Sequence, residues 1–262
     1  MEKITSLQNS RIKDIIHLSK PRERKEKNLM VVEGFREITM AYHAGIQLKE
    51  VYYSPEVNLH PQAQPIIDNI PLKFEVSKPV FEKIAYREHS DGLIALGVPK
   101  YLSLNDLKLR SNPLLLVLES VEKPGNLGAL LRTADAAAID AILVCDPQTD
   151  LFNPNVIRSS LGCIFSKQVV ACSTHDALDF LHQKNIKSFA AALTAKKFYH
   201  QTDFTQSCAI VMGTESTGLT DAWLTGADEQ IKIPMNGKVD SLNVSTSAAI
   251  LVFEAKRQRN FR

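Results

Sequence analysis

Continuous apolar runs alternate with helical segments in the second half of this 262-residue chain, and this alternation restricts its fold more than any other feature. Residues 114–120 read LLLVLES, 141–146 read AILVCD and 208–213 read CAIVMG, and each run is followed by helical spacing of apolar residues. A strand that is apolar throughout is covered on both faces, as the central strands of parallel sheets are. The pattern predicts an α/β domain with a doubly covered parallel sheet.

The first half alternates on a smaller scale, with strand-like segments such as 29–33 and 92–98. Residues 1–30 hold eight Lys/Arg against four Asp/Glu, which suggests a basic helical arm that contacts nucleic-acid phosphates or, equally, a solvated helix face. We therefore expect an arm plus a small α/β domain in residues 1–100, a polar linker in 101–112 and the larger domain in 113–262.

Composition excludes several classes of protein. Hydrophobic residues make up 44% and charged residues 23%, which is typical of a globular chain. No apolar run approaches the ~20 residues of a membrane span, and the start lacks a signal-peptide core, so we expect a soluble cytoplasmic protein without a membrane partner. The scattered cysteines favour buried free thiols over disulfides or a zinc site. They are Cys145, Cys163, Cys172 and Cys208.

Glycine and polar residues follow three of the expected strands, in the loops that begin at residues 121, 214 and 235. Ligands bind at the carboxyl ends of strands in sheets of this kind, so these loops predict a site. Each loop also has a purely structural explanation: Asn126 or Ser241 could cap a helix, and Glu215 could oppose a helix dipole. The convergence of all three loops favours a site.

Familiar catalytic motifs are missing from the sequence. No G-x-G-x-x-G follows a strand, and neither G-x-x-x-x-G-K-[ST], H-E-x-x-H nor G-x-S-x-G occurs. Dinucleotide-fingerprint enzymes, phosphate-loop ATPases, zinc hydrolases and α/β-hydrolases therefore lose support, and no metal site is expected.

Three segments do carry a resemblance. PGNLGALLRTADA resembles the first motif of the SpoU/TrmH family of RNA 2′-O-methyltransferases, in which an Asn precedes an Arg by six positions. VMGTESTGL is similar to the second motif, and IPMNGKVDSLNVSTSAAILVFEAKRQ to the third. VIRSSLGCIF resembles the family's R-x-S-x-G stretch, and the first half is more loosely similar to an L30e-like substrate-binding domain. The matching positions are Asn126, Arg132, Gly213, Glu215, Ile233, Pro234, Ser241, Leu242, Asn243, Arg257 and Gln258.

The resemblance implies a SPOUT fold with a trefoil knot, a homodimer joined through the last helix, and methyl transfer from S-adenosylmethionine to a ribose 2′-hydroxyl. Its L30e-like half favours ribosomal RNA, 23S above all, as the partner, and DNA is not expected. The implied catalytic residues are Asn126, Arg132, Glu215, Ser241 and Asn243. The cofactor-binding residues are Gly213, Ile233, Met235, Leu242 and, from its strand end alone, Leu193. The expected RNA-binding residues are Arg11, Lys20, Arg22, Arg24, Lys25 and Arg158.

A guanidinium group has a pKa above ~12, so Arg132 is a poor general base. It would either hold an RNA phosphate that accepts the proton or stabilise the developing alkoxide. Glu215 would anchor Arg132 or a loop, while the other catalytic residues orient the hydroxyl. Three alternatives stay open: a transfer-RNA 2′-O-methyltransferase, an RNA-binding protein that has lost catalysis, and an α/β enzyme acting on a small metabolite.

Overall fold

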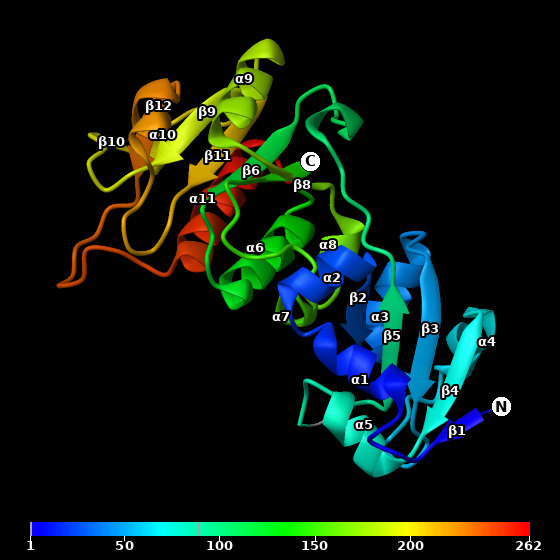
Figure 1. The fold of residues 1–262 in the computed structure, drawn as a ribbon. Coiled ribbons are helices and arrows are strands. Elements are labelled where there is room, and N and C mark those ends of the chain that lie inside the picture. The colour runs from blue at the N-terminus through cyan, green and yellow to red at the C-terminus, as the bar shows by residue number, and fades with distance from the viewer. Residues whose placement is uncertain (1, 89) are drawn as a thin grey trace. The chain divides into compact units, whose positions relative to one another are not determined.

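The computed structural model describes residues 2–88 and 90–262 and divides into two compact units (Figure 1). The first unit contains the chain up to Lys100 together with Asp150–Ser166. The second contains Tyr101–Thr149 and Lys167–Arg262. Among the described residues, none of the helices is long and apolar enough to cross a membrane.

The first unit is built on a five-stranded mixed sheet with the strand order β1-β4-β3-β5-β2. Strands β1, β4 and β3 are parallel, whereas β5 runs antiparallel to both β3 and β2. The strands are β1 (Glu2–Ile4), β2 (Met30–Glu33), β3 (Leu48–Tyr53), β4 (Leu72–Val76) and β5 (Leu93–Gly97). The helices are α1 (Ser10–His17), α2 (Pro21–Lys27), α3 (Phe35–His43), α4 (Gln64–Asn69), α5 (Lys78–Ile84), α7 (Pro154–Ser159) and α8 (Cys163–Ser166).

The basic segment at the start of the chain belongs to this unit's core and is not a separate arm. Ile12 and Ile15 on α1 are buried together with Leu18 in the cluster that covers the sheet. Asn9 caps α1 by accepting a hydrogen bond from the backbone N–H of Arg11, 2.9 Å away. The amphipathic spacing of α1 therefore buries an apolar face, and its charged residues lie on the other side.

The segment that resembles R-x-S-x-G forms two short helices, α7 and α8, within the first unit, although we expect residues 113–262 to form one domain from the sequence. Leu161 and Gly162 break the helix because both adopt positive φ, at 54° and 81°. Gly162 also lies close to α3: a Cβ there would stand 3.1 Å from the Met40 side chain and 3.2 Å from Glu37 Cα. Glycine satisfies both the left-handed backbone and the close approach.

The second unit contains a seven-stranded sheet of entirely parallel strands in the order β10-β12-β9-β11-β6-β7-β8, which confirms the expected fold class. The strands are β6 (Leu114–Glu119), β7 (Ala141–Cys145), β8 (Val169–Cys172), β9 (Lys187–Ala191), β10 (Lys197–Phe198), β11 (Cys208–Met212) and β12 (Glu229–Lys232). The helices are α6 (Pro124–Ala136), α9 (Thr174–Gln183), α10 (Asp221–Gly226) and α11 (Val244–Gln258), with short 3₁₀ turns η1 (Leu104–Asp106) and η2 (Tyr199–Gln201).

Both faces of this sheet are covered, as its apolar strands predict. Leu115 and Val211 pack in one cluster with residues of α9 and with Trp223 of α10. The alternate residues Leu116 and Ile210 are also fully buried. Helices α6 and α11 pack against each other, and α11 contacts β11. The strand order places β11 between β6 and β9, with β12 beyond β9, so the loops after these strands emerge at one edge.

Candidate active site

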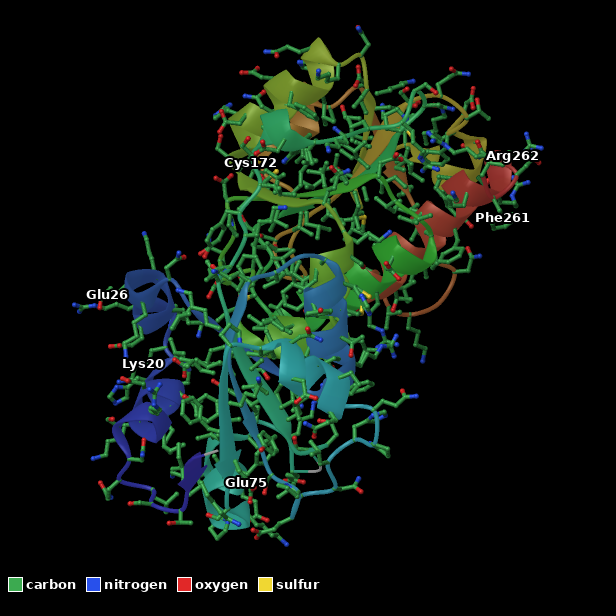
Figure 2. All side chains as sticks on the ribbon, turned by 90° about the vertical axis from the view of Figure 1, so that its right-hand side faces the viewer. Lys20, Glu26, Glu75, Cys172, Phe261 and Arg262 are labelled. Atoms are coloured by element: carbon green, nitrogen blue, oxygen red, sulfur yellow. The ribbon has the colours of Figure 1, made fainter. Side chains whose placement is uncertain are left out.

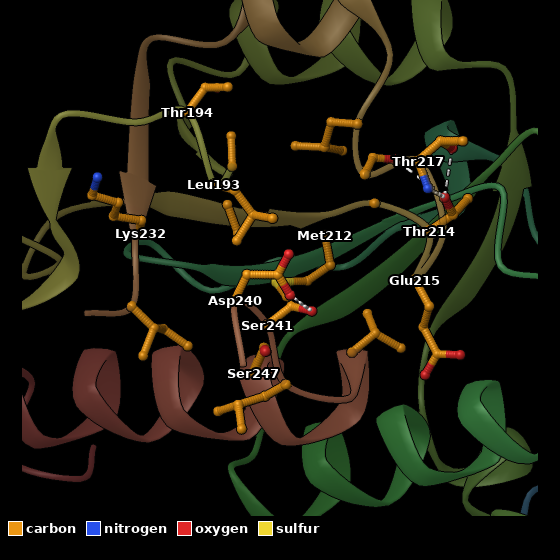
Figure 3. A pocket seen from close by; sticks show the side chains of 18 of the residues that line it. Leu193, Thr194, Met212, Thr214, Glu215, Thr217, Lys232, Asp240, Ser241 and Ser247 are labelled. Carbon is orange, nitrogen blue, oxygen red and sulfur yellow. Dashed lines mark hydrogen bonds between the residues drawn. The ribbon is translucent and has the colours of Figure 1, made fainter. Parts of the chain in front are cut away.

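A cavity of about 350 Å³ lies at the carboxyl ends of β9, β11 and β12 (Figure 3). Its volume falls in the roughly 300–1,000 Å³ range of small-molecule sites, and most of its walls are apolar. All five residues predicted to bind a cofactor line it. They are Leu193, Gly213, Ile233, Met235 and Leu242.

Gly213 is required by the chain's own loop. A Cβ at this position would clash with the backbone of Gly218 and lie 2.5 Å from the backbone nitrogen of Leu219. The loop returns on itself because the N–H of Thr214 donates to the Gly218 carbonyl at 3.0 Å, and a reciprocal bond of 3.2 Å closes the pair. The polar residues between these positions are thereby held beside the cavity.

A smaller cavity of about 70 Å³ adjoins this loop. It is lined by Lys123 and Asn126 from the loop and first turn after β6, and by Val244 from the start of α11. Residues 213–216 line both cavities. The three motifs that are separate in sequence therefore meet at one edge of the sheet.

The carboxylate of Glu215 is the centre of this meeting point. Asn243 Nδ2 donates to Glu215 Oε1 at 2.5 Å, and Lys123 Nζ lies 2.8 Å from Glu215 Oε2. Asn243 Nδ2 also lies 3.4 Å from Asn126 Oδ1. The hydrogen bond from Lys123 lowers the pKa of Glu215 below its usual value, so the side chain is ionised at neutral pH.

Asn243, and not Ser241, caps the last helix. Its Oδ1 accepts hydrogen bonds from the backbone N–H of Ser245 at 2.9 Å and from the Ser245 hydroxyl at 2.5 Å. The Ser241 hydroxyl instead donates to Asp240 Oδ1 at 3.1 Å, and both side chains line the large cavity. One side chain, Asn243, thus fixes the helix start with its oxygen and the polar cluster with its nitrogen.

Arg132 lies outside this cluster. Its side chain is exposed on α6, lines neither cavity, and makes no hydrogen bond or ion pair with any residue that the structure describes. Side chains six positions apart on a helix point in directions about 120° apart around the helix axis, so Arg132 and Asn126 lie on different faces of α6. Of the two partners expected for Glu215, Arg132 or a loop, the structure shows the loop, since Glu215 binds Lys123 and Asn243.

The residues expected to bind RNA differ in their availability. Lys20, Arg22, Lys25 and Arg158 are exposed, and Figure 2 shows Lys20 at the surface of the first unit. Arg11 is half-buried, pairs with Glu50 at 3.4 Å and lies over the Phe74 ring.

Arg24 has to be removed from the expected RNA-binding set. Only 4% of its side chain is exposed, and its guanidinium forms an ion pair with Asp150 at 2.7 Å. It also donates to the carbonyls of Leu18 and Ser19. These partners hold α2 against the segment that contains α7, so Arg24 has a structural role.

Several cavity residues were not singled out from the sequence. Thr194, Lys232, Asp240 and Ser247 line the large cavity, and Lys123 lines the small one. Asp240 and Ser247 lie within the segment that resembles the third motif and Lys123 directly precedes the first, which was a usable signal, whereas nothing local marked Thr194. All four cysteines are free, and the described residues contain no cluster suited to a metal ion.

Comparison with known families agrees with the motifs. The profile of the SpoU rRNA methylase family matches residues 113–253, and that of the MRM3-like substrate-binding domain matches residues 9–95. The 23S rRNA (guanosine(2553)-2′-O)-methyltransferase RlmP of Bacillus subtilis is 28% identical over 256 residues, which cover 98% of this chain and 100% of that protein.

Solved structures show the same likeness over nearly the whole chain. A crystal structure of an RNA 2′-O ribose methyltransferase has a TM-score of 0.88 and 40% identity, covering 98% of this chain and 99% of that one. The AdoMet-bound rRNA methyltransferase of Sinorhizobium meliloti has a TM-score of 0.89 and 28% identity, covering 98% and 97%. With its three motifs gathered at one sheet edge and the family profile matched over more than half its length, this chain belongs to the SpoU rRNA methylase family.

Proposed function

We propose that this protein transfers a methyl group from S-adenosylmethionine to a ribose 2′-hydroxyl of ribosomal RNA, 23S RNA above all. The observation that carries the proposal is the cluster of Asn126, Glu215 and Asn243, one residue from each motif, beside the large cavity. The Bacillus subtilis relative acts on 23S rRNA, and the Sinorhizobium meliloti protein is an rRNA methyltransferase with bound cofactor. Because DNA lacks the 2′-hydroxyl, the reaction requires RNA.

The large cavity fits the cofactor. Ile233, Leu242 and Met212 give it apolar walls for an adenine ring, and Thr194 and Ser247 add hydroxyl groups that can bind polar atoms of the ligand. S-adenosylmethionine supplies an electrophilic methyl group on a sulfonium sulfur.

The small cavity gives the ribose hydroxyl a place between the motifs. Asn126 orients the hydroxyl there with its amide group, while Asn243 and the ionised Glu215 fix the loops around it. A new oxygen–carbon bond forms as the carbon–sulfur bond breaks, and the hydroxyl proton must leave in the same process. Arg132, which lies outside this cavity and whose charge no described group neutralises, holds a phosphate of the substrate RNA that accepts this proton.

We further propose that the chain is threaded as a trefoil knot, that two copies form a homodimer through α11, and that the protein is located in the cytoplasm. The choice of α11 as the dimer surface is supported by Phe253, a large apolar side chain that is 42% exposed on this helix.

Ribosomal RNA is favoured over transfer RNA because the first unit matches a substrate-binding domain and the relatives act on rRNA. The test incubates the purified protein and labelled S-adenosylmethionine with ribosomal subunits, free ribosomal RNA and transfer RNA from cells that lack the gene. We expect label in a ribosomal sample alone. Label in transfer RNA alone would overturn the substrate, and no label in any sample despite bound cofactor would support an RNA-binding protein without catalysis.

A further inference from the structure

Three of the described residues that line the large cavity carry ionisable side chains: Glu215, Lys232 and Asp240. Glu215 is neutralised by Lys123 at 2.8 Å. Lys232 stands apart, because its Nζ lies 5.6 Å from the centre of the Phe198 ring, and Figure 3 shows the ammonium pointing away from the cavity. Asp240 is therefore the carboxylate whose charge faces the ligand space without an opposing cation.

The carboxylate of Asp240 is exposed and accessible to a ligand. Within the part of the chain that the structure describes, its carboxylate accepts one hydrogen bond, from the Ser241 hydroxyl at 3.1 Å. Figure 3 shows the side chain directed into the cavity, where Leu193 and Met212 contribute apolar surface.

We propose that Asp240 recognises the positively charged methionine half of S-adenosylmethionine, through its sulfonium or its α-ammonium group. A single unpaired carboxylate attracts a cationic ligand and repels nucleotides that carry phosphates, so it selects among adenosine-containing ligands. This inference rests on the proposed function, since it assumes that the large cavity holds the cofactor. It adds to that function the residue that distinguishes this cofactor from other adenosine compounds.

The test compares the wild type with Asp240→Asn, which keeps the size of the side chain and an oxygen for Ser241 but removes the charge. Calorimetry measures the Kd for S-adenosylmethionine and for methylthioadenosine, which has the same adenosine thioether but no positive charge. We expect the substitution to raise the Kd for S-adenosylmethionine by about tenfold or more, while the Kd for methylthioadenosine changes by less than about twofold. Equal changes for both ligands, or no change for either, would overturn the proposal.

A third ligand, S-adenosylhomocysteine, identifies the recognised group, because it keeps the ammonium and lacks the sulfonium. A parallel loss of its affinity assigns the contact to the ammonium, and an unchanged affinity assigns it to the sulfonium. Asp221→Asn is the matched control, since Asp221 is exposed at the start of α10 and does not line the cavity. If the wild type itself fails to bind S-adenosylmethionine, the proposed function fails, whereas tight binding that Asp240→Asn leaves intact defeats this inference alone.

Discussion

Lys123 Nζ lies 2.8 Å from Glu215 Oε2, and this ion pair joins two strand-end loops that are 92 residues apart in sequence. The same carboxylate accepts a hydrogen bond from Asn243 at the start of α11. Glu215 and Asn243, whose Nδ2 also lies 3.4 Å from Asn126 Oδ1, together connect all three motifs. Their main contribution is to hold the other groups in position, and positioning of this kind can lower a reaction barrier by several kcal/mol.

Replacing Glu215 by Gln should lower turnover by about tenfold to a hundredfold, because a neutral amide neither pairs with Lys123 nor fixes the Asn243 amide in the same way. Single-turnover methyl transfer measures the effect. Asp179→Asn, a change of the same kind at an exposed position of α9, should leave the rate as it is. Equal rates for Glu215→Gln and the wild type would show that the connection between the loops is not needed for the reaction.

Arg132→Ala should remove turnover, by about a hundredfold or more, while the Kd of S-adenosylmethionine and the thermal stability stay close to those of the wild type. The unchanged affinity and stability follow from the position of Arg132, which is exposed, makes no hydrogen bond or ion pair with the described residues and lines neither cavity. Calorimetry and a turnover assay on the same preparation separate the two effects. A variant with near-normal turnover would remove Arg132 from the mechanism.

Asp140 should stabilise the second unit in a pH-dependent way. Burial by itself raises the pKa of Asp140, but hydrogen bonds from Arg110 and from the backbone N–H of Leu114 outweigh burial and lower it. A carboxyl with a lowered pKa stabilises the fold above its ordinary pKa of about 3.9, and this contribution is lost as the pH falls through the lower folded value.

Asp140→Asn should therefore reduce the free energy of unfolding at pH 7 by about 1–3 kcal/mol, and the difference from the wild type should shrink below about pH 4. Urea unfolding between pH 3 and pH 7 measures both quantities. Asp179→Asn again serves as the control. A difference that stays constant across this range would mean that ionisation of Asp140 contributes nothing to stability.

RNA binding by the first unit should depend on salt through Lys20 and Lys25, which are exposed and have no ion-pair partner among the described residues. Replacing both by Gln should weaken binding and reduce the slope of log K against log salt by roughly 1.4–1.8, which corresponds to two phosphate contacts. The control replaces Lys108 and Lys184, two exposed lysines of the second unit, in the same way. An unchanged slope would identify the basic segment as a solvated helix face.

The parallel sheet and the cofactor cavity could be predicted from the sequence because both follow from local patterns. Strands such as Leu114–Glu119 and Cys208–Met212 are apolar at every position, which requires cover on both faces. Strand ends in such a sheet share one edge, so Leu193 could be placed beside a ligand before the structure was known, whereas Ile233 was placed there by the resemblance to the third motif.

Features that depend on partners distant in sequence could not be predicted. Arg24 looked like one more surface cation, yet its partner Asp150 is 126 residues away. The packing of the segment around Gly162 on α3 likewise has no local signal. Ser241 and Asn243 are equally good cap residues by type, and only the geometry of the turn decides for Asn243.

The most direct test of the central claim is the chemical position of the transferred methyl group. Ribosomal RNA labelled by this enzyme and S-adenosylmethionine is hydrolysed with alkali, which requires a free 2′-hydroxyl to cleave the chain. We predict that the label is recovered in an alkali-resistant dinucleotide at a single site, and that Arg132→Ala yields none. Label released entirely in mononucleotides would place the methyl group on a base and contradict ribose 2′-O-methylation.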